Sequence, residues 1–192
     1  MTQVALISGI KANRGAEFDR SLPVNLEPVI LTTNLSNGQL RLTAGTSTFG
    51  TGPGADRAGV NWNGICYRAM GSKLVRVSDI GQVTVIGEIG EGEASFTYSF
   101  DRLAVRSGGK LFYYDGTALT QVTDPDLGTC LDLEWFDGYF VSTDGMSIIV
   151  TELTDPTAIE GIRYGSAEND PDMIKGVLRL RDELYAFGRH SI

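Results

Sequence analysis

Short apolar runs separated by glycine-containing turns dominate the chain from Gly59 onward. The segment Gly64–Val77 is followed, 37 positions later, by Asp101–Tyr114, and each segment has an apolar run, a glycine turn and a second apolar run. A looser third copy spans Asp137–Val150, and Arg181–Ile192 opens a fourth. The identical residues at equivalent places in the first two copies are Gly71 and Gly108, Lys73 and Lys110, and Leu74 and Leu111.

Each copy is typical of a β-hairpin, because two apolar runs flank a turn that contains glycine. Hairpins that recur about every 40 residues indicate the blades of a β-propeller. We therefore predict an all-β, β-propeller-like fold of repeated antiparallel blades with about four strands each. The expected strands are Val60–Trp62, Ile65–Ala69, Leu74–Val77, Gln82–Ile86, Phe96–Phe100, Leu103–Arg106, Lys110–Tyr114, Leu119–Val122, Leu131–Phe136, Tyr139–Ser142, Ser147–Glu152, Gly161–Tyr164 and Ile174–Leu180.

The first 50 residues have a different pattern. Polar residues 11–20 precede an expected extended element at Leu22–Asn25, and a turn is expected at Asn37-Gly38 before a strand at Leu40–Leu42. We predict an N-terminal arm with lead-in strands over residues 1–50 and the first propeller blades over residues 51–192. Because the chain stops inside a hairpin that begins at Leu184, we expect the propeller to be incomplete within it and to continue in a longer protein or another chain.

Charge and hydropathy narrow the classes of function. The 24 acidic residues outnumber the 16 basic ones, giving a net charge of −8, and the basic residues are scattered along the chain. Tight, direct DNA binding is not expected, since it requires clustered cations. No apolar stretch approaches the roughly 18 residues of a membrane-spanning helix, and the N-terminus lacks the features of a signal peptide. We expect synthesis in a cytosol.

The residues most often used in catalysis and metal binding are sparse. Cys66 and Cys130 lie in separate apolar runs, which favours buried free thiols over a disulfide. His190 is the only histidine, so a metal site with two imidazoles is excluded, and a surface or strand-end position is expected for it. We predict no catalytic residues, no metal and no cofactor.

Three local patterns resemble functional motifs and are better explained by structure. Gly45–Thr51 has the glycine spacing of a phosphate-binding loop, but threonine replaces its lysine. Asp124–Gly128 lacks ligands of a calcium loop, so a turn is expected. Asp132, Glu134 and Asp137 lie near a tryptophan and could form a carboxylate pair, although such residues are common at strand ends.

Aromatic residues expected to pack in the core are Tyr67, Phe112, Tyr113, Trp135, Tyr139 and Phe140.

Dispersed positions along nearly the whole chain form a further pattern. They are Leu22–Asn25, Gly38–Arg41, Gly45, Arg57–Val60, Tyr67, Arg68, Gly71, Lys73, Leu74, Asp144, Gly145, Thr151, Leu153, Tyr164, Ala167, Glu168, Pro171, Asp172, Ile174, Gly176, Arg181, Asp182, Phe187, Gly188 and Ser191. At these positions the chain resembles the packaged-DNA stabilisation proteins, or head-completion tail hubs, of short-tailed double-stranded DNA phages. None of the matching positions is catalytic, so the resemblance concerns fold and assembly.

The resemblance implies a structural protein of the virion tail, present in the host cytoplasm during assembly. Such a protein forms a ring, expected to contain six copies, beneath the portal and its adaptor, where it narrows the DNA exit and receives the tail needle. No membrane contact is expected in the assembled state. The polar N-terminal run is the expected interface with the neighbouring ring, through Asn13, Arg14, Glu17, Phe18, Asp19 and Arg20. The alternative function is a β-propeller enzyme or a carbohydrate-binding module, since fold alone does not decide function.

Overall fold

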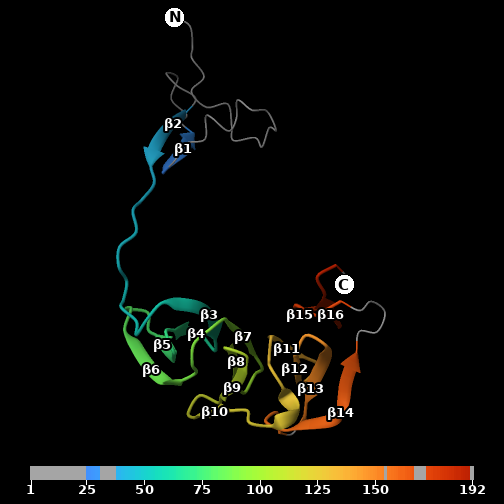
Figure 1. The fold of residues 1–192 in the computed structure, drawn as a ribbon. Helices are drawn as coiled ribbons and strands as arrows, with labels where there is room; N and C mark the ends of the chain where they lie inside the picture. The colour runs from blue at the N-terminus through green and yellow to red at the C-terminus, as the bar shows by residue number, and fades with distance from the viewer. Residues whose placement is uncertain (1–24, 31–37, 154, 167–171, 191–192) are drawn as a thin grey trace, which may run out of the picture. The chain divides into compact units, whose positions relative to one another are not determined.

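The computed structural model describes residues 25–30, 38–153, 155–166 and 172–190. The chain forms two compact units, Met1–Thr48 and Phe49–Ile192. In the first unit, β1 (Leu26–Ile30) and β2 (Gly38–Leu42) pair as an antiparallel two-stranded sheet (Figure 1). Glu27 and Arg41 lie directly opposite each other, and the Arg41 Nε–H donates to Glu27 Oε1 at 2.7 Å. This cross-strand ion pair helps to fix the register.

The sequence prediction for this first unit was partly wrong. Strand β1 was missed because Pro28 argues against a strand, although proline is tolerated in an edge strand such as this one. The extended element expected at Leu22–Asn25 lies mostly outside the described residues, and Asn25 itself lies at a bend with φ of 56°. Of the expected Asn37-Gly38 turn, only Gly38 is described, and it already belongs to β2.

The second unit contains three four-stranded sheets and one two-stranded sheet, each with its strands paired in sequence order (Figure 1). The first sheet comprises β3 (Asp56–Trp62), β4 (Ile65–Met70), β5 (Lys73–Val77) and β6 (Val83–Glu88). The second comprises β7 (Ala94–Tyr98), β8 (Leu103–Ser107), β9 (Lys110–Tyr114) and β10 (Leu119–Gln121). The third comprises β11 (Asp132–Phe136), β12 (Tyr139–Thr143), β13 (Ser147–Thr151) and β14 (Ile159–Ser166), and the last comprises β15 (Gly176–Leu180) and β16 (Glu183–Phe187).

The first strands of consecutive sheets lie against one another: β3 contacts β7, β7 contacts β11, and β11 contacts β15. Figure 1 shows β6, β10 and β14 on the opposite, outer side of the sheets. Antiparallel four-stranded sheets that meet through their first strands are propeller blades. The predicted all-β, propeller-like fold is therefore confirmed, with three complete blades and the first two strands of a fourth among the described residues.

The turns between the first and second strands have the same geometry in the first and third blades. Asn63 and Gly64 have φ of 51° and 76°, and Asp137 and Gly138 have φ of 48° and 88°. Positive φ at both positions is the type I′ geometry that suits a two-residue hairpin. The corresponding turn of the second blade is longer, since residues 99–102 separate β7 from β8, and it is closed by the Ser99 N–H, which donates to the Arg102 carbonyl at 2.9 Å. Strand β7 therefore ends at Tyr98, two residues earlier than expected.

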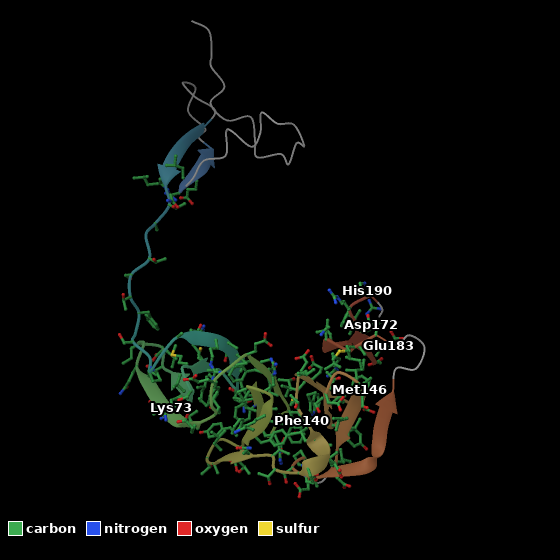
Figure 2. All side chains as sticks on the ribbon, in the orientation of Figure 1. Lys73, Phe140, Met146, Asp172, Glu183 and His190 are labelled. Carbon is green, nitrogen blue, oxygen red and sulfur yellow. The ribbon has the colours of Figure 1, made fainter. Side chains whose placement is uncertain are left out.

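Alternation of side chains between the two faces of the second blade builds the core. Leu103 and Phe112 pack toward the first blade, whereas Leu111 and Tyr113 pack toward the third. All five residues of β8 are buried because this blade is covered on both faces. Figure 2 shows Phe140 in the layer of side chains between the second and third blades, where its ring centroid lies 4.9 Å from that of Tyr113.

The predicted core role of the aromatic residues is confirmed for four of six. The side chains of Tyr67, Phe112, Tyr113 and Phe140 are buried. Tyr139 is only partly buried, and Trp135 packs against the core while also reaching a surface cleft. Phe112 and Tyr113 are both buried although they point to opposite faces, because the second blade is covered on both faces.

The segments that connect the blades follow a common rule. Ile89, Cys130 and Ile174 each precede a new blade, and each is buried. Their backbone N–H groups donate to carbonyls in the second hairpin turn of the blade just completed, at Ser72 (2.8 Å), Gly109 (2.9 Å) and Gly145 (2.9 Å). One buried apolar side chain and one backbone hydrogen bond thereby anchor each connection to the preceding blade.

The helical content of the described residues is one 3-10 turn, η1 (Pro125–Leu127). Asp124 caps it by accepting the Asp126 N–H at 2.9 Å, and its second carboxylate oxygen accepts the Ile159 N–H of β14 at 3.0 Å. The turn expected at Asp124–Gly128 is thus confirmed, and the Asp124 carboxylate caps it. No described helix has the length and apolarity needed to cross a membrane.

The two cysteines are free, as predicted, and differ in environment. Cys130 is buried, and burial raises the pKa of its thiol to about 12, whereas Cys66 is half-buried. Because the thiolate is the reactive form, we expect iodoacetamide at pH 8 to label Cys66 at least about ten times faster than Cys130. Peptide mass spectrometry of the folded protein measures both rates. Cys66→Ser should abolish the fast phase and Cys130→Ser should keep it; equal rates at the two thiols would contradict the packing of Cys130.

Candidate functional site

A cleft of about 570 Å³ opens where the first strands of the blades meet. Each described blade contributes side chains to it, through β3, β7, β11 and β15 and the turns that follow β3 and β7. A volume in this range is typical of small-ligand sites. The lining residues are Trp62, Asn63, Phe96, Thr97, Tyr98, Ser99, Phe100, Glu134, Trp135 and Arg179.

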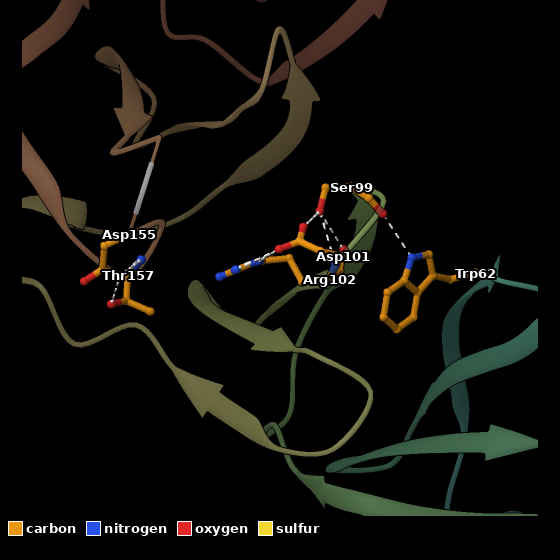
Figure 3. A network of polar contacts seen from close by, with 6 residues as sticks. All are labelled: Trp62, Ser99, Asp101, Arg102, Asp155 and Thr157. Atoms are coloured by element: carbon orange, nitrogen blue, oxygen red, sulfur yellow. Dashed lines mark hydrogen bonds and ion pairs between the residues drawn. The ribbon is translucent and has the colours of Figure 1, made fainter.

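Trp62 forms one wall of the cleft and is fixed by the neighbouring blade. Its indole Nε1–H donates to the Ser99 carbonyl at 3.0 Å (Figure 3). The same turn is closed by Asp101, whose carboxylate accepts hydrogen bonds from the Ser99 hydroxyl and the Arg102 guanidinium. Burial opposes ionisation of Asp101, but these hydrogen bonds outweigh it and lower the pKa of the carboxyl. The turn is therefore a rigid support for the rim of the cleft.

This turn makes stability depend on pH. Because the folded pKa of Asp101 lies below its unfolded value, its stabilising contribution is present above about pH 4 and is lost as the pH falls. Asp101→Asn should lower the free energy of unfolding by about 1 kcal/mol or less at pH 7, since the ion pair is largely exposed to solvent, and by less at pH 3. Urea unfolding at both pH values measures the difference. Asp137→Asn, in an exposed turn, is the control. A loss of unfolding free energy on Asp101→Asn that was larger at pH 3 than at pH 7 would contradict the lowered pKa of Asp101.

Hydroxyl and carboxylate side chains join the first strands across the blades. The Thr97 hydroxyl of β7 donates to Glu134 Oε1 at 3.0 Å and accepts the Trp135 N–H of β11 at 3.2 Å. Between the third and fourth blades, the Val177 N–H of β15 donates to Asp132 Oδ2 of β11 at 3.0 Å. The inner strand edges are thus satisfied by side chains of the preceding blade.

Arg179 extends from β15 over the Trp135 ring, with its guanidinium carbon 5.6 Å from the ring centroid. This is cation–π geometry. Its Nε–H donates to the Arg181 carbonyl at 3.2 Å. Arg179 forms no ion pair with a described carboxylate. The cleft therefore combines aromatic rings, a carboxylate and a guanidinium.

The candidate carboxylates from the sequence do not form one group. Asp132 and Glu134 lie on the same face of β11 and accept the hydrogen bonds that join the blades, while Asp137 lies in the following turn with φ of 48°. His190 is exposed, as expected, and its backbone N–H donates to the Asp172 carboxylate (Figure 2). No group of three or more potential metal-ligating side chains occurs among the described residues. Gly45–Thr51 is an exposed irregular segment.

Two arginines that the sequence did not single out hold adjacent blades together. Arg57 of β3 donates to the Gly90 carbonyl at 2.8 Å, the Gly92 carbonyl at 2.7 Å and the Ser107 hydroxyl at 2.9 Å. Arg106 of β8 donates to the Cys130 carbonyl at 3.2 Å. Arg106 also donates to the Glu93 carboxylate at 3.1 Å. The repeat offers no signal for either role, because most of the partners are backbone carbonyls. The predicted interface residues Asn13, Arg14, Glu17, Phe18, Asp19 and Arg20 lie outside the described residues.

Comparison with solved structures gives distant likenesses. The computationally designed Ika4 protein matches with a TM-score of 0.56 and 10% identity, over 77% of this chain and 95% of the designed one, which shows similarity of fold alone. Glutaminyl cyclase of Myxococcus xanthus matches with a TM-score of 0.45 and 19% identity, over 71% of this chain and 62% of the cyclase. BamB from Moraxella catarrhalis matches with a TM-score of 0.49 and 13% identity, over 69% of this chain and 41% of BamB.

Comparison with protein families is decisive. A search of curated proteins finds no match. The family model described as "Bacteriophage P22 Gp10, beta-propeller" matches residues 2–192, nearly the whole chain. The family consists of structural phage tail proteins that stabilise packaged DNA, which agrees with the resemblance noted in the sequence. With its propeller blades and this match, the chain belongs to the bacteriophage P22 Gp10 beta-propeller family.

Proposed function

We propose that this chain is a tail hub that assembles as a ring of six copies beneath the portal and its adaptor. There it narrows the DNA exit, receives the tail needle and so retains the packaged genome. The family match over residues 2–192 is the observation that carries the proposal. Assembly takes place in the host cytoplasm, and the final location is the tail of the virion.

The chemistry of the described residues supports a structural role. Asp132 and Glu134, the best carboxylate candidates, accept hydrogen bonds that hold one blade to the next. The polar groups of Arg57 and Arg106 serve the same purpose. These polar side chains therefore stabilise the blades instead of converging on one reacting atom.

The negative net charge of the chain supports a mechanism in which the tail needle, acting as a plug, retains the packaged DNA. A net charge of −8 disfavours tight contact with DNA phosphates. A hub that does not grip DNA leaves the genome free to exit once the needle is removed. We expect the isolated chain to bind duplex DNA no more tightly than about 10 µM at physiological salt. A fluorescence-anisotropy titration that gave nanomolar binding would contradict the plug mechanism.

A DNA-retention assay tests the function. Filled heads that carry the adaptor but lack this protein are incubated with the purified chain and the tail needle, and DNA that becomes sensitive to nuclease is measured. The proposal predicts at least about a tenfold decrease in leaked DNA, because a closed exit removes the escape route. Leakage that is unchanged by the chain would exclude the hub function.

The interface with the neighbouring ring is proposed to be the polar N-terminal run that contains Arg14 and Arg20. Reversing both charges (Arg14→Glu, Arg20→Glu) should weaken incorporation into particles at least about tenfold, since like charges across an interface are strongly unfavourable. Lys110→Glu makes a matched charge reversal on an exposed strand position of the second blade. If Lys110→Glu lowered incorporation as much as the Arg14 and Arg20 changes, the interface would lie on the blades.

A further inference from the structure

The cleft between the first strands exposes aromatic rings that the core leaves uncovered. Tyr98, the last residue of β7, is 47% exposed, and Phe100, in the turn that follows, is 86% exposed. Trp135 lies at the same cleft under the Arg179 guanidinium. Exposed rings gathered in one concave site cost solvation free energy unless a ligand covers them.

The two charged groups of the cleft retain hydrogen-bonding capacity. Glu134 uses Oε1 to accept from Thr97 and from the Trp135 N–H, and its other oxygen has no partner among the described residues. Arg179 uses only Nε within the described part of the chain. The second Glu134 oxygen can therefore accept a hydrogen bond from a ligand, and the remaining Arg179 N–H groups can donate hydrogen bonds to it.

The backbone of the cleft is not available to an added strand. The Trp135 and Val177 N–H groups, at the inner edges of β11 and β15, already donate to Thr97 and Asp132. A peptide that binds by β-strand addition needs such groups to be free. The ligand must instead be recognised by side chains.

We propose that this cleft binds a neutral saccharide of about two sugar rings. Sugar hydroxyls both donate and accept, which matches the free Glu134 oxygen and the Arg179 donors, and the apolar ring faces of a sugar cover Tyr98 and Phe100. A cleft of about 570 Å³ accommodates a ligand of this size. The net charge of −8 favours a neutral sugar over an acidic one. The inference goes beyond the tail-hub function and does not depend on ring assembly.

Tryptophan fluorescence of the full chain provides the test, because Trp62 and Trp135 are its only tryptophans and both line the cleft. The probes are maltose, cellobiose, lactose and N,N′-diacetylchitobiose, each up to 10 mM, with galacturonic acid as the acidic comparison. At least one disaccharide should bind with a dissociation constant of about 1 mM or less. No response to any of them overturns the proposal.

Variants separate binding in the cleft from binding elsewhere. Phe100→Ala, Arg179→Gln and Glu134→Gln should each weaken disaccharide binding at least about tenfold. Phe49→Ala, at a 64% exposed aromatic residue that does not line the cleft, should leave the affinity unchanged. Equal losses for Phe49→Ala and Phe100→Ala would overturn the proposal.

Discussion

Gly108→Ala is expected to lower the free energy of unfolding by about 4 kcal/mol. Gly108 has φ of 56°, and a Cβ at this position would lie 2.2 Å from the Glu91 backbone oxygen. The loop that carries Glu91 cannot easily retreat, because the carbonyls of Gly90 and Gly92 on either side are held by Arg57. Urea unfolding followed by circular dichroism measures the loss. Domains are stable by only about 5–15 kcal/mol, so the effect should be large.

Gly64→Ala is the matched control for this variant. Gly64 has φ of 76°, but no atom lies within 4 Å of the position that a Cβ would take. Alanine there introduces backbone strain without a collision and should cost about 1–2 kcal/mol. Equal costs at Gly64 and Gly108 would show that the turn between β8 and β9 does not approach the loop before β7 as closely as described.

Leu111→Ala is expected to destabilise the protein by about 2–5 kcal/mol. Leu111 is 1% exposed and lies in the core cluster between the second and third blades. Its removal leaves a cavity lined by side chains of two different sheets, which cannot collapse without moving one sheet against the other. Chemical denaturation of the full chain measures the change.

The control for Leu111→Ala is Ile80→Ala, at a side chain that is 76% exposed. Because Ile80 has little contact to lose, this change should stay within about 0.5 kcal/mol of the parent. A loss below about 1 kcal/mol at Leu111 would contradict the stacking of the second and third blades. A combined Leu111→Ala, Ile80→Ala variant should lose the sum of the two effects, because the sites share no core cluster.

The strands could be predicted from the sequence because the information that defines them is local. The glycine turns lie within short stretches of sequence, and the identical Leu74 and Leu111 align two blades without any knowledge of contacts. Strand β1 could not be predicted, since Pro28 is tolerated there only because of its place in a two-stranded sheet.

The cleft could not be predicted because its members are distant in the sequence. Trp62, Tyr98 and Arg179 come together only through the contacts among the first strands of the blades. The sequence placed Trp135 among the core aromatics, and it could not reveal that Arg179 covers one of its faces. The role of Arg57 was missed for a related reason, because two of its partners are loop carbonyls, which every residue possesses, and the third is Ser107, 50 positions away.

Assembly as a tail hub is the central proposal, and the mass of the native complex is its most direct test. The full chain is measured by light scattering alone and after mixing with purified portal-adaptor complexes. The account predicts that the complex gains the mass of six copies of this chain and that the Arg14→Glu, Arg20→Glu variant adds much less. A mixture that contains only the separate masses of the chain and the portal-adaptor complex would contradict the account.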